Sequence, residues 1–371
     1  MLLVKSKNEL KKEKCMNQVL EKPMDRMVVP YELELIQKLS KDLKKTATNL
    51  GRTEARNLVD LYYQMQNLRI GTEGQLRAIH QSGLNEPNET LKYFNNGFDQ
   101  LEQNLQKVLD VYTKSTPVGK WLRSINGIGP VIAAGLLANL EVNERITAGH
   151  FWSYCGLNDY NRPWLGREKT KAIVDEVLGD KKNKDITYED FAECCRRTKW
   201  KAHNVIKAVN GKKEPIFIDG DKYKFTKEDI IKQLSKKPYN SRMKTLCWKL
   251  AQSFVKGQNN PNDIYGKLYI ERKAYENELN EKLAYKDQAS IGAQRVGKTT
   301  EAYKWYSKGM LPPAHINRRA ERWATRIFLS HLHQVMYMVE LGQLPPKPFA
   351  EAHLEHIHMI ECPNLDLVMA G

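Results

Sequence analysis

Apolar residues recur at helical spacing along most of the chain. From Pro30 to about residue 80 they return every three or four positions, which is typical of amphipathic helices. The glycines at 71 and 74 predict a break in this run. A second stripe predicts a long helix over 89–112, with the apolar members Leu91, Phe94, Phe98, Leu101, Leu105 and Leu109. This stripe fits one arm of a coiled coil, or equally a helix packed within its own domain.

Periodicity also predicts helices in the second half of the chain. The expected elements are a pair of short helices within 118–139, a short helix over 147–155 that ends at Gly156, and longer helices over 241–256, 265–283 and 316–341. Residues 157–236 are the least regular. They contain a predicted strand pair, 215–218 and 223–225, joined by the turn sequence Asp219-Gly220-Asp221. Residues 284–313 are polar and rich in turn formers.

These patterns predict a mainly α fold. A helical N-terminal region and a coiled-coil-like helix precede a helix-hairpin-helix domain that carries a small β-hairpin insertion. The expected organisation is a flexible basic arm (1–28), a helical N-terminal region (29–85), the coiled-coil-like helix (86–117), the hairpin and the turn after it (118–167), the insertion (168–236), basic helices that complete the domain (237–342) and a His-rich tail (343–371).

Charge narrows the possible partners. The chain has 371 residues, with 59 Lys and Arg against 44 Asp and Glu, which gives a formal net charge of +15. Such a surplus indicates an anionic partner, and no apolar stretch is long enough to span a membrane. The cysteines form no CxxC pair; they are Cys15, Cys155, Cys194, Cys195, Cys247 and Cys362. Reduced structural thiols in a cytoplasmic protein are therefore expected.

The segment Ile125-Asn126-Gly127-Ile128-Gly129-Pro130-Val131 carries the clearest chemistry. Two glycines around one apolar residue allow a tight turn that a ligand can approach closely. Pro130 suits the first turn of a helix, where its missing N–H costs nothing. The free amides of the turn and of the helix N-terminus would then point outward as an anion site for a nucleic-acid phosphate. An ordinary glycine-rich turn inside a core has the same pattern.

The run 125–137 resembles the C-terminal domain of bridge-RNA-guided DEDD insertion-sequence transposases. Three further pieces follow in the family's order: 150–157 resembles its "aayaGL" element, 240–249 its basic "gNrylRrll" helix, and the helix from Asn317 to Leu332 its last basic helix. The stripe over 89–112 would match the coiled coil before the hairpin. The resemblance spans about 89–342 and implies a domain that holds DNA.

The family's catalytic groups do not carry over to this sequence. Its nuclease-like domain begins with an apolar strand that bears an Asp, whereas the first 85 residues here are helical and basic in pattern. The family's catalytic Ser follows the "GL" pair, and residues 158–166 contain no Ser. An insertion of residues 168–235 then separates this stretch from the basic helix. No catalytic residue is therefore assigned, and Mg²⁺ is expected only if the chain is catalytic.

Two other motifs suggest ligands. Residues 292–299 match GxxxxGK[ST], but no buried strand precedes them, so a flexible Gly/Lys loop is favoured over a nucleotide-binding P-loop. His353, His356 and His358 lie near Cys362, and His331 and His333 lie on a predicted helix. Their spacing matches no zinc finger, so interfacial histidines are favoured and no metal is predicted.

Basic rows on two helices complete the candidate site. Arg242, Lys244 and Lys249 lie on the first, and Arg318, Arg319, Arg322 and Arg326 lie on the second. Such rows neutralise backbone phosphates, although a solvated helix face has the same composition. Three tryptophans, Trp164, Trp200 and Trp248, are either base-stacking residues or core anchors.

The sequence therefore predicts a transposase-like protein that grips DNA, or structured RNA, in recombination or mobile-element biology. The predicted site comprises Gly127, Ile128, Gly129 and Val131 with the seven basic residues above. A homodimer through 89–112 is expected, with no membrane association and no cofactor. The alternatives are an active transposase, recombinase or nuclease, and a P-loop nucleotidase.

Overall fold

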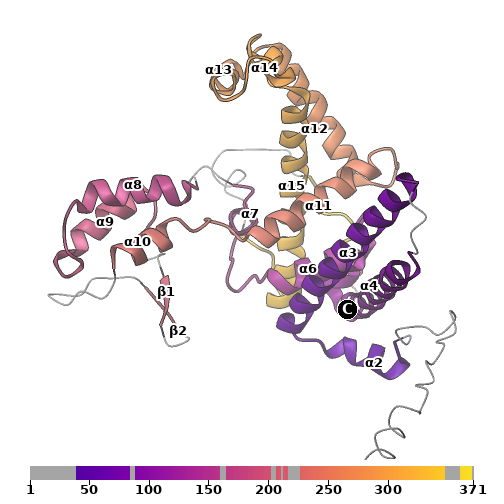
Figure 1. Cartoon of the computed structure of the whole chain (residues 1–371). Helices are drawn as coiled ribbons and strands as arrows, with labels where there is room; N and C mark the ends of the chain where they lie inside the picture. Colours follow the sequence, from indigo (N-terminus) through magenta and orange to yellow (C-terminus); the bar gives the residue numbers. More distant parts are fainter. Residues whose placement is uncertain are drawn as a thin grey trace, which may run out of the picture. The chain divides into compact units, whose positions relative to one another are not determined.

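The structure is a computed structural model that describes residues 39–83, 88–158, 164–201, 206–209, 212–215, 226–346 and 360–369. These residues are mainly helical, which confirms the prediction of a mainly α protein (Figure 1). The predicted basic arm, 1–28, lies outside them. The chain divides into two compact units, residues 1–40 with 64–104 and residues 41–63 with 105–371.

The first unit contains the later part of α3 (Arg52–Gln81) and the earlier part of α4 (Glu89–Lys114). Glu102 of α4 joins them, because it accepts hydrogen bonds from Arg69 Nε at 2.7 Å and Gln66 Nε2 at 3.0 Å. The predicted break at 71–74 is wrong, since α3 is helical throughout. Two glycines cost roughly 2 kcal/mol of helix propensity, and tertiary contacts and the Arg69–Glu73 ion pair within α3 offset that cost.

The second unit is built around an aromatic cluster. Its main helices are α5 (Pro117–Ser124), α6 (Pro130–Asn139), α11 (Ser241–Gly257), α12 (Ile264–Glu281) and α15 (Pro313–Leu341). The ring of Phe328 on α15 lies 5.9 Å from Trp121 of α5, 5.8 Å from Phe254 of α11 and 5.3 Å from Tyr265 of α12, between ring centroids. One α15 side chain thus fixes three helices from distant parts of the sequence.

A buried carboxylate ties neighbouring helices together. Glu276 of α12 accepts hydrogen bonds from Arg272, from Tyr285 and from Arg319 of α15. Burial alone raises the pKa of Glu276, but the hydrogen bonds from Tyr285, Arg319 and Arg272 outweigh it and hold that pKa below its usual value. Accordingly, α12 and α15 run side by side along much of their length (Figure 1).

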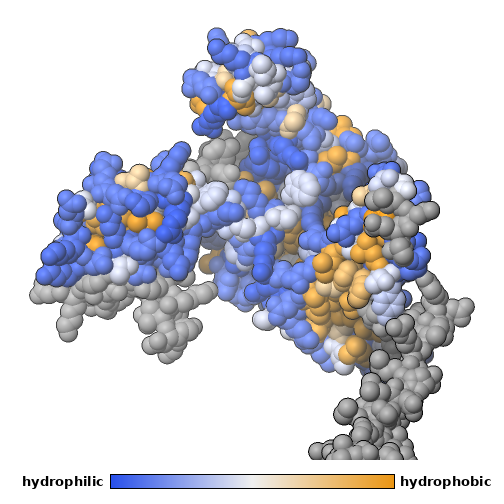
Figure 2. Space-filling view, viewed as in Figure 1, coloured by the Kyte–Doolittle hydropathy of each residue, from blue (hydrophilic) through white to orange (hydrophobic). Residues whose placement is uncertain are grey.

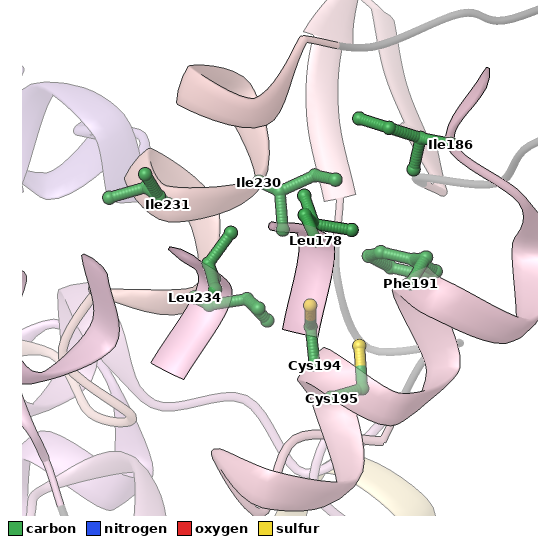
Figure 3. Close-up of a cluster of buried hydrophobic side chains, with 9 residues drawn as sticks. Leu178, Ile186, Phe191, Cys194, Cys195, Ile230, Ile231 and Leu234 are labelled. Atoms are coloured by element: carbon green, nitrogen blue, oxygen red, sulfur yellow. The ribbon is translucent and has the colours of Figure 1, made fainter. Parts of the chain in front are cut away.

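The described residues between 166 and 234 form a small helical module with its own core, and these helices were not expected in the part of the sequence that looks least regular. Its helices are α8 (Gly166–Leu178), η2 (Asn183–Asp185), α9 (Tyr188–Arg197) and α10 (Lys227–Leu234). Figure 3 shows their buried side chains converging: Leu178, Ile186, Phe191, Cys194, Cys195, Ile230, Ile231 and Leu234. Capping boxes begin α9 and α10, at Thr187 with Asp190 and at Thr226 with Asp229.

The module also contains an antiparallel strand pair, β1 (Ile206–Val209) and β2 (Lys212–Pro215). Ile206 lies opposite Pro215, and Val209 opposite Lys212. Apart from Pro215, the strand pair predicted for 215–225 lies outside the described residues.

The remaining short elements are α2 (Lys41–Thr46), η1 (Ala47–Asn49), α7 (Ala148–Tyr154), α13 (Lys286–Arg295), α14 (Glu301–Tyr306) and α17 (Asp366–Met369). The helices α13 and α14 correct the expectation that 284–313 is turn-rich. They pack around Ala289, Leu311 and Ile316, and Asn280 pairs with both backbone groups of Leu311. Within the described residues, no helix has the length and apolar character needed to cross a membrane.

Candidate nucleic-acid interface

The candidate site is the hairpin, defined here as α5, the turn 125–129 and α6. Thr116 begins α5 by accepting a hydrogen bond from Gly119 N at 3.0 Å. In the turn, Ile128 N donates to Ile125 O at 3.2 Å, and the Ile125 and Ile128 side chains are buried. Gly127 has a φ of +82°, and Gly129 is the N-cap of α6, followed by Pro130. The predicted tight turn with an apolar plug is therefore present.

The glycines of the hairpin have different roles. Gly127 needs its left-handed conformation, and a Cβ there would lie 3.1 Å from Ser253 Cβ of α11. A Cβ on Gly119 would lie 1.9 Å from the carbonyl oxygen of Thr113, so no side chain fits. A Cβ on Gly135 would lie 2.8 Å from Leu246, which shows how closely α6 approaches α11. Gly129, in contrast, has open space around it and an ordinary φ of −78°.

The start of α6 presents unpaired backbone donors. The amides of Gly127, Gly129, Val131 and Ile132 have no hydrogen-bond acceptor among the described residues. Gly127 is exposed and Gly129 half-buried, so solvent reaches the turn, whereas the Val131 side chain is buried. At the opposite end of α6, Arg56 donates to Ala138 O at 2.9 Å and Arg52 to Leu140 O at 2.8 Å. The positive end of the helix dipole is therefore the end left open.

Side chains from distant segments hold the turn in place. The Arg123 guanidinium donates to Ile128 O and to Asp110 Oδ1, the latter at 3.2 Å. Asn126 Nδ2 donates to Asn262 O at 2.7 Å, in the connection between α11 and α12. The turn is therefore tied to two other parts of the unit, the end of α4 and the connection between α11 and α12.

The C-terminal segment 360–369 covers α5. Trp121 Nε1 donates to Pro363 O at 2.7 Å, and Asn364 Nδ2 donates to Ser124 Oγ at 2.9 Å. From α15, His331 Nε2 lies 2.9 Å from Ile360 O, and His331 Nδ1 lies 2.8 Å from Tyr265 Oη. Burial lowers the pKa of His331. This histidine is thus an internal hydrogen-bonding group.

The basic residues predicted on α11 lie beside aromatic or acidic groups. Arg242 forms an ion pair with Asp60 of α3. The Lys244 ammonium lies 4.3 Å from the Tyr239 ring centroid, and the Lys249 ammonium lies 3.3 Å from that of Tyr63. Burial lowers the pKa of Lys249. The Lys249 ammonium thus contacts the Tyr63 ring and is only partly accessible to a ligand.

The four arginines predicted on α15 differ in their contacts. Arg319 binds the buried Glu276 at 2.6 Å, and Arg318 binds the buried Glu321 at 2.6 Å while its side chain stays about half exposed. Arg326 is half-buried, and its carbonyl oxygen accepts a hydrogen bond from Trp152 Nε1. Arg322 is exposed and has no acidic partner among the described residues. The structure therefore favours Arg318 and Arg322 as the surface cations of this row.

The tryptophans also divide by environment. Trp200 packs on the core of residues 166–234 and donates to Leu234 O at 2.9 Å, so it is an anchor. Trp164 and Trp248 are exposed, at 52% and 48%. Trp164 Nε1 donates to Ser235 O, whereas the Trp248 indole has no hydrogen-bond partner among the described residues.

Other predicted ligand groups do not assemble into a site. Residues 292–295 belong to helix α13, so 292–299 does not form a P-loop. No cluster of three or more metal-binding side chains occurs among the described residues, and His353, His356 and His358 lie outside them. Burial raises the pKa of Cys194 to about 11 and of Cys195 to about 12, so both are protonated thiols at neutral pH.

Sequence reasoning missed Gly119, Arg123 and Asn126, which define the hairpin as much as the predicted residues do. A signal for the first exists, because Thr116-Pro117 before Gly119 is a helix-start pattern. The partners of Arg123 and Asn126 depend on the fold, so no local pattern reveals them.

Comparison with known proteins gives a family match in the region of the hairpin. A sequence profile of the transposase IS116/IS110/IS902 family matches residues 119–163. The match covers most of α5, the turn, α6 and α7, and it indicates a transposase relationship for this segment. Searches of curated proteins and of solved structures gave no significant match.

Proposed function

We propose that this transposase-like protein binds the backbone of DNA, or of structured RNA, with the open end of α6 as a helix-hairpin-helix phosphate site. The observation that carries the proposal is the set of unpaired amides at Gly127, Gly129, Val131 and Ile132. Amides at a helix N-terminus bind phosphate oxygens and read no base. Recombination or mobile-element biology is the process that the family match favours.

Surface charge supports the proposal. The net charge of +15 attracts polyanions, and Lys120 on α5, Lys256 on α11 and Arg322 on α15 are exposed without an acidic partner among the described residues. Each phosphate neutralised by such a cation releases counterions, so affinity should fall steeply with salt. Arg319 is removed from this set, because its guanidinium is bound to Glu276.

Gly129 provides a clean test of the phosphate site. Gly129→Asp adds a negative charge where the structure has open space, so it should weaken duplex binding by roughly tenfold or more without unfolding the hairpin. Gly129→Ala is the matched control, since it adds a Cβ without charge. Gly127 is unsuitable, because any side chain there is strained. Mobility shifts over a salt series measure the effect, and equal binding by both variants and the wild type would refute the proposal.

A second candidate function is strand cleavage, which the transposase match favours. The test is incubation of supercoiled plasmid with the protein and Mg²⁺ or Mn²⁺. Nicking that co-purifies with the wild type and disappears on a single Asp or Ser substitution would establish an active recombinase or nuclease. The residues at the family's catalytic Ser position include 159–163, which lie outside the described residues.

We also propose that α4 mediates a homodimer. In the first unit, Tyr93 and Phe94 of α4 are 43% and 52% exposed, and Leu68 and Ile70 of α3 are 46% and 49% exposed. Figure 2 shows an apolar area, in orange, over the α3 region. Phe94→Asp should convert dimer to monomer in light scattering after size exclusion, with Gln103→Asp as an exposed control on the same helix. A wild-type protein that is monomeric at all concentrations would refute this.

A further inference from the structure

An outward-facing row on α11 places a tryptophan among polar and basic side chains. Every member of the row has another member three or four residues away, so the residues share one side of the helix: Ser241, Lys244, Thr245, Trp248, Gln252 and Lys256. Trp248 is 48% exposed, whereas Trp121 is fully buried in the same unit. The row therefore presents one flat aromatic surface among polar and basic side chains.

A fixed arginine lies next to this ring. The Arg318 guanidinium carbon lies 5.8 Å from the Trp248 ring centroid. Arg318 Nη1 also donates to Glu321 Oε2 at 2.6 Å, and Glu321 is 4% exposed. The same carboxylate accepts from Gln252 Nε2 of α11 at 3.1 Å and from Asn317 Nδ2 at 2.7 Å. The carboxylate therefore holds the guanidinium beside the indole and ties α11 to α15.

The charge around the ring is positive. Arg322 follows Arg318 by one helical turn on α15, and Lys256 follows Gln252 by one turn on α11. Both are exposed and have no acidic partner among the described residues. A flat aromatic surface flanked by cations matches a nucleotide, because a base stacks on the ring while adjacent phosphates meet the cations.

We infer that Trp248 stacks on an unpaired base of the bound nucleic acid and that Arg318 and Arg322 contact the phosphates beside that base. This inference rests on the proposed function, and it adds the substrate class: nucleic acid with a loop, bulge or single-stranded segment. In a regular duplex the bases are stacked on one another, so an indole on the protein surface has no base face to contact. Recognition by Trp248 therefore selects unpaired structure, with no requirement for sequence.

The first experiment compares two DNA substrates. One is a duplex with a central loop of unpaired thymines, and the other is the fully paired duplex of the same length. Trp248→Ala should weaken binding to the looped substrate by roughly tenfold, the size expected for loss of one base-aromatic stack, and should leave duplex binding within about twofold. Trp248→Phe keeps an aromatic face and should retain most of the affinity. Equal loss on both substrates, or loss on neither, would overturn the inference.

Intrinsic fluorescence gives an independent readout, because stacking on a base quenches an indole. Unlabelled oligothymidylate should quench the wild type and the Trp164→Phe variant equally, whereas Trp248→Phe should remove the quenching. Trp164 is the matched control, since it is also exposed and lies 5.0 Å from the Lys237 ammonium. Unchanged quenching in Trp248→Phe would also overturn the inference.

Gly129→Asp separates this inference from the proposed function. If Gly129→Asp weakens both substrates and Trp248→Ala weakens neither, the phosphate site stands and the stacking role falls. If both variants bind both substrates like the wild type, both proposals fall. If Trp248 contacts a protein partner instead of a base, Gly129→Asp should weaken binding of both substrates and Trp248→Ala should weaken neither.

Discussion

The hairpin and the module of residues 166–234 bury short helices in different ways. The hairpin helices have 8 and 10 residues, and their burial comes from distant partners such as Phe328, Pro363 and Ser253. The helices of the module have 13, 10 and 8 residues, and they pack on one another around a shared core. Local capping boxes set where two of them begin.

This difference means that the hairpin depends on the helices packed around Phe328 and on residues 360–369, whereas the module of residues 166–234 can be perturbed by itself. Each of the following substitutions tests that statement, from the largest expected effect to the smallest.

Trp121→Ala should cause the largest loss. The indole is fully buried, stacks on Phe328 and donates to Pro363 O, so its removal should lower the free energy of unfolding by about 4 kcal/mol. Chemical denaturation measures the change, and duplex binding should fall in parallel because the turn loses its support. Trp121→Phe should restore much of the stability. A loss of less than about 1 kcal/mol would show that the hairpin is independent of the aromatic cluster.

Leu178→Ala should destabilise the module by about 3 kcal/mol and spare the hairpin. Leu178 is 1% exposed and packs within the cluster shown in Figure 3. Hydrogen exchange should increase in α8, α9 and α10 only, and duplex affinity should match the wild type. Faster exchange in α5 and α6 as well would contradict the separation of the two regions.

Glu276→Gln should lower stability by about 2 kcal/mol at neutral pH, because the hydrogen bonds from Arg272 and Arg319 lose their charged acceptor. The folded-state pKa of Glu276 is lowered, so its stabilisation is present above the unfolded value of 4.5 and is lost as the pH falls through the folded value. Unfolding curves of the wild type and the variant should therefore converge in acid. Glu278→Gln, on the exposed side of α12, should change little at any pH. A constant difference between wild type and Glu276→Gln would refute the assignment.

Thr226→Ala should have the smallest effect, about 1 kcal/mol, since it removes the side-chain cap of α10. The loss should appear as increased exchange in the module and not in binding. Ser235→Ala is a suitable control, because its hydroxyl donates only a long hydrogen bond to Lys232 O, at 3.3 Å. A similar loss of stability in both variants would mean that the capping box at Thr226 does not stabilise α10.

The sequence predicts elements well where one strong local signal dominates. The turn around Gly127 and Gly129, the helix that ends before Gly156 and the long helices α11, α12 and α15 all lie close to their expected positions. The wrong expectations have two causes. Gly71 and Gly74 are weak helix formers, but the helix around them outweighs their propensity. The short helices α9 and α10 lie between polar, turn-rich stretches that hide their periodicity. The threonine-aspartate spacing of their capping boxes would have located both of them.

The candidate site was predictable only in part. The glycine turn can be read from local sequence, but the distinction between Gly127 and Gly129 depends on Ser253, which belongs to another helix. The rows of basic residues can also be read from the sequence. Whether each cation is available to a nucleic-acid phosphate depends on its acidic neighbours, such as Asp60 for Arg242 and Glu276 for Arg319. The position of Trp248 on an amphipathic helix does not decide whether its side chain is exposed or buried. Long-range pairing thus decides which predicted residues reach a ligand.

The contact between Trp121 and Pro363 has a consequence for biosynthesis. The hairpin is encoded in the middle of the chain, but α5 can form its hydrogen bonds with Pro363 and Asn364 only after the ribosome has made those residues. A nascent chain that stops earlier has the turn sequence without the segment that covers it. Maturation of the hairpin is therefore expected to follow synthesis of residues 360–369, so that truncated translation products engage nucleic acid less well than the chain that contains them.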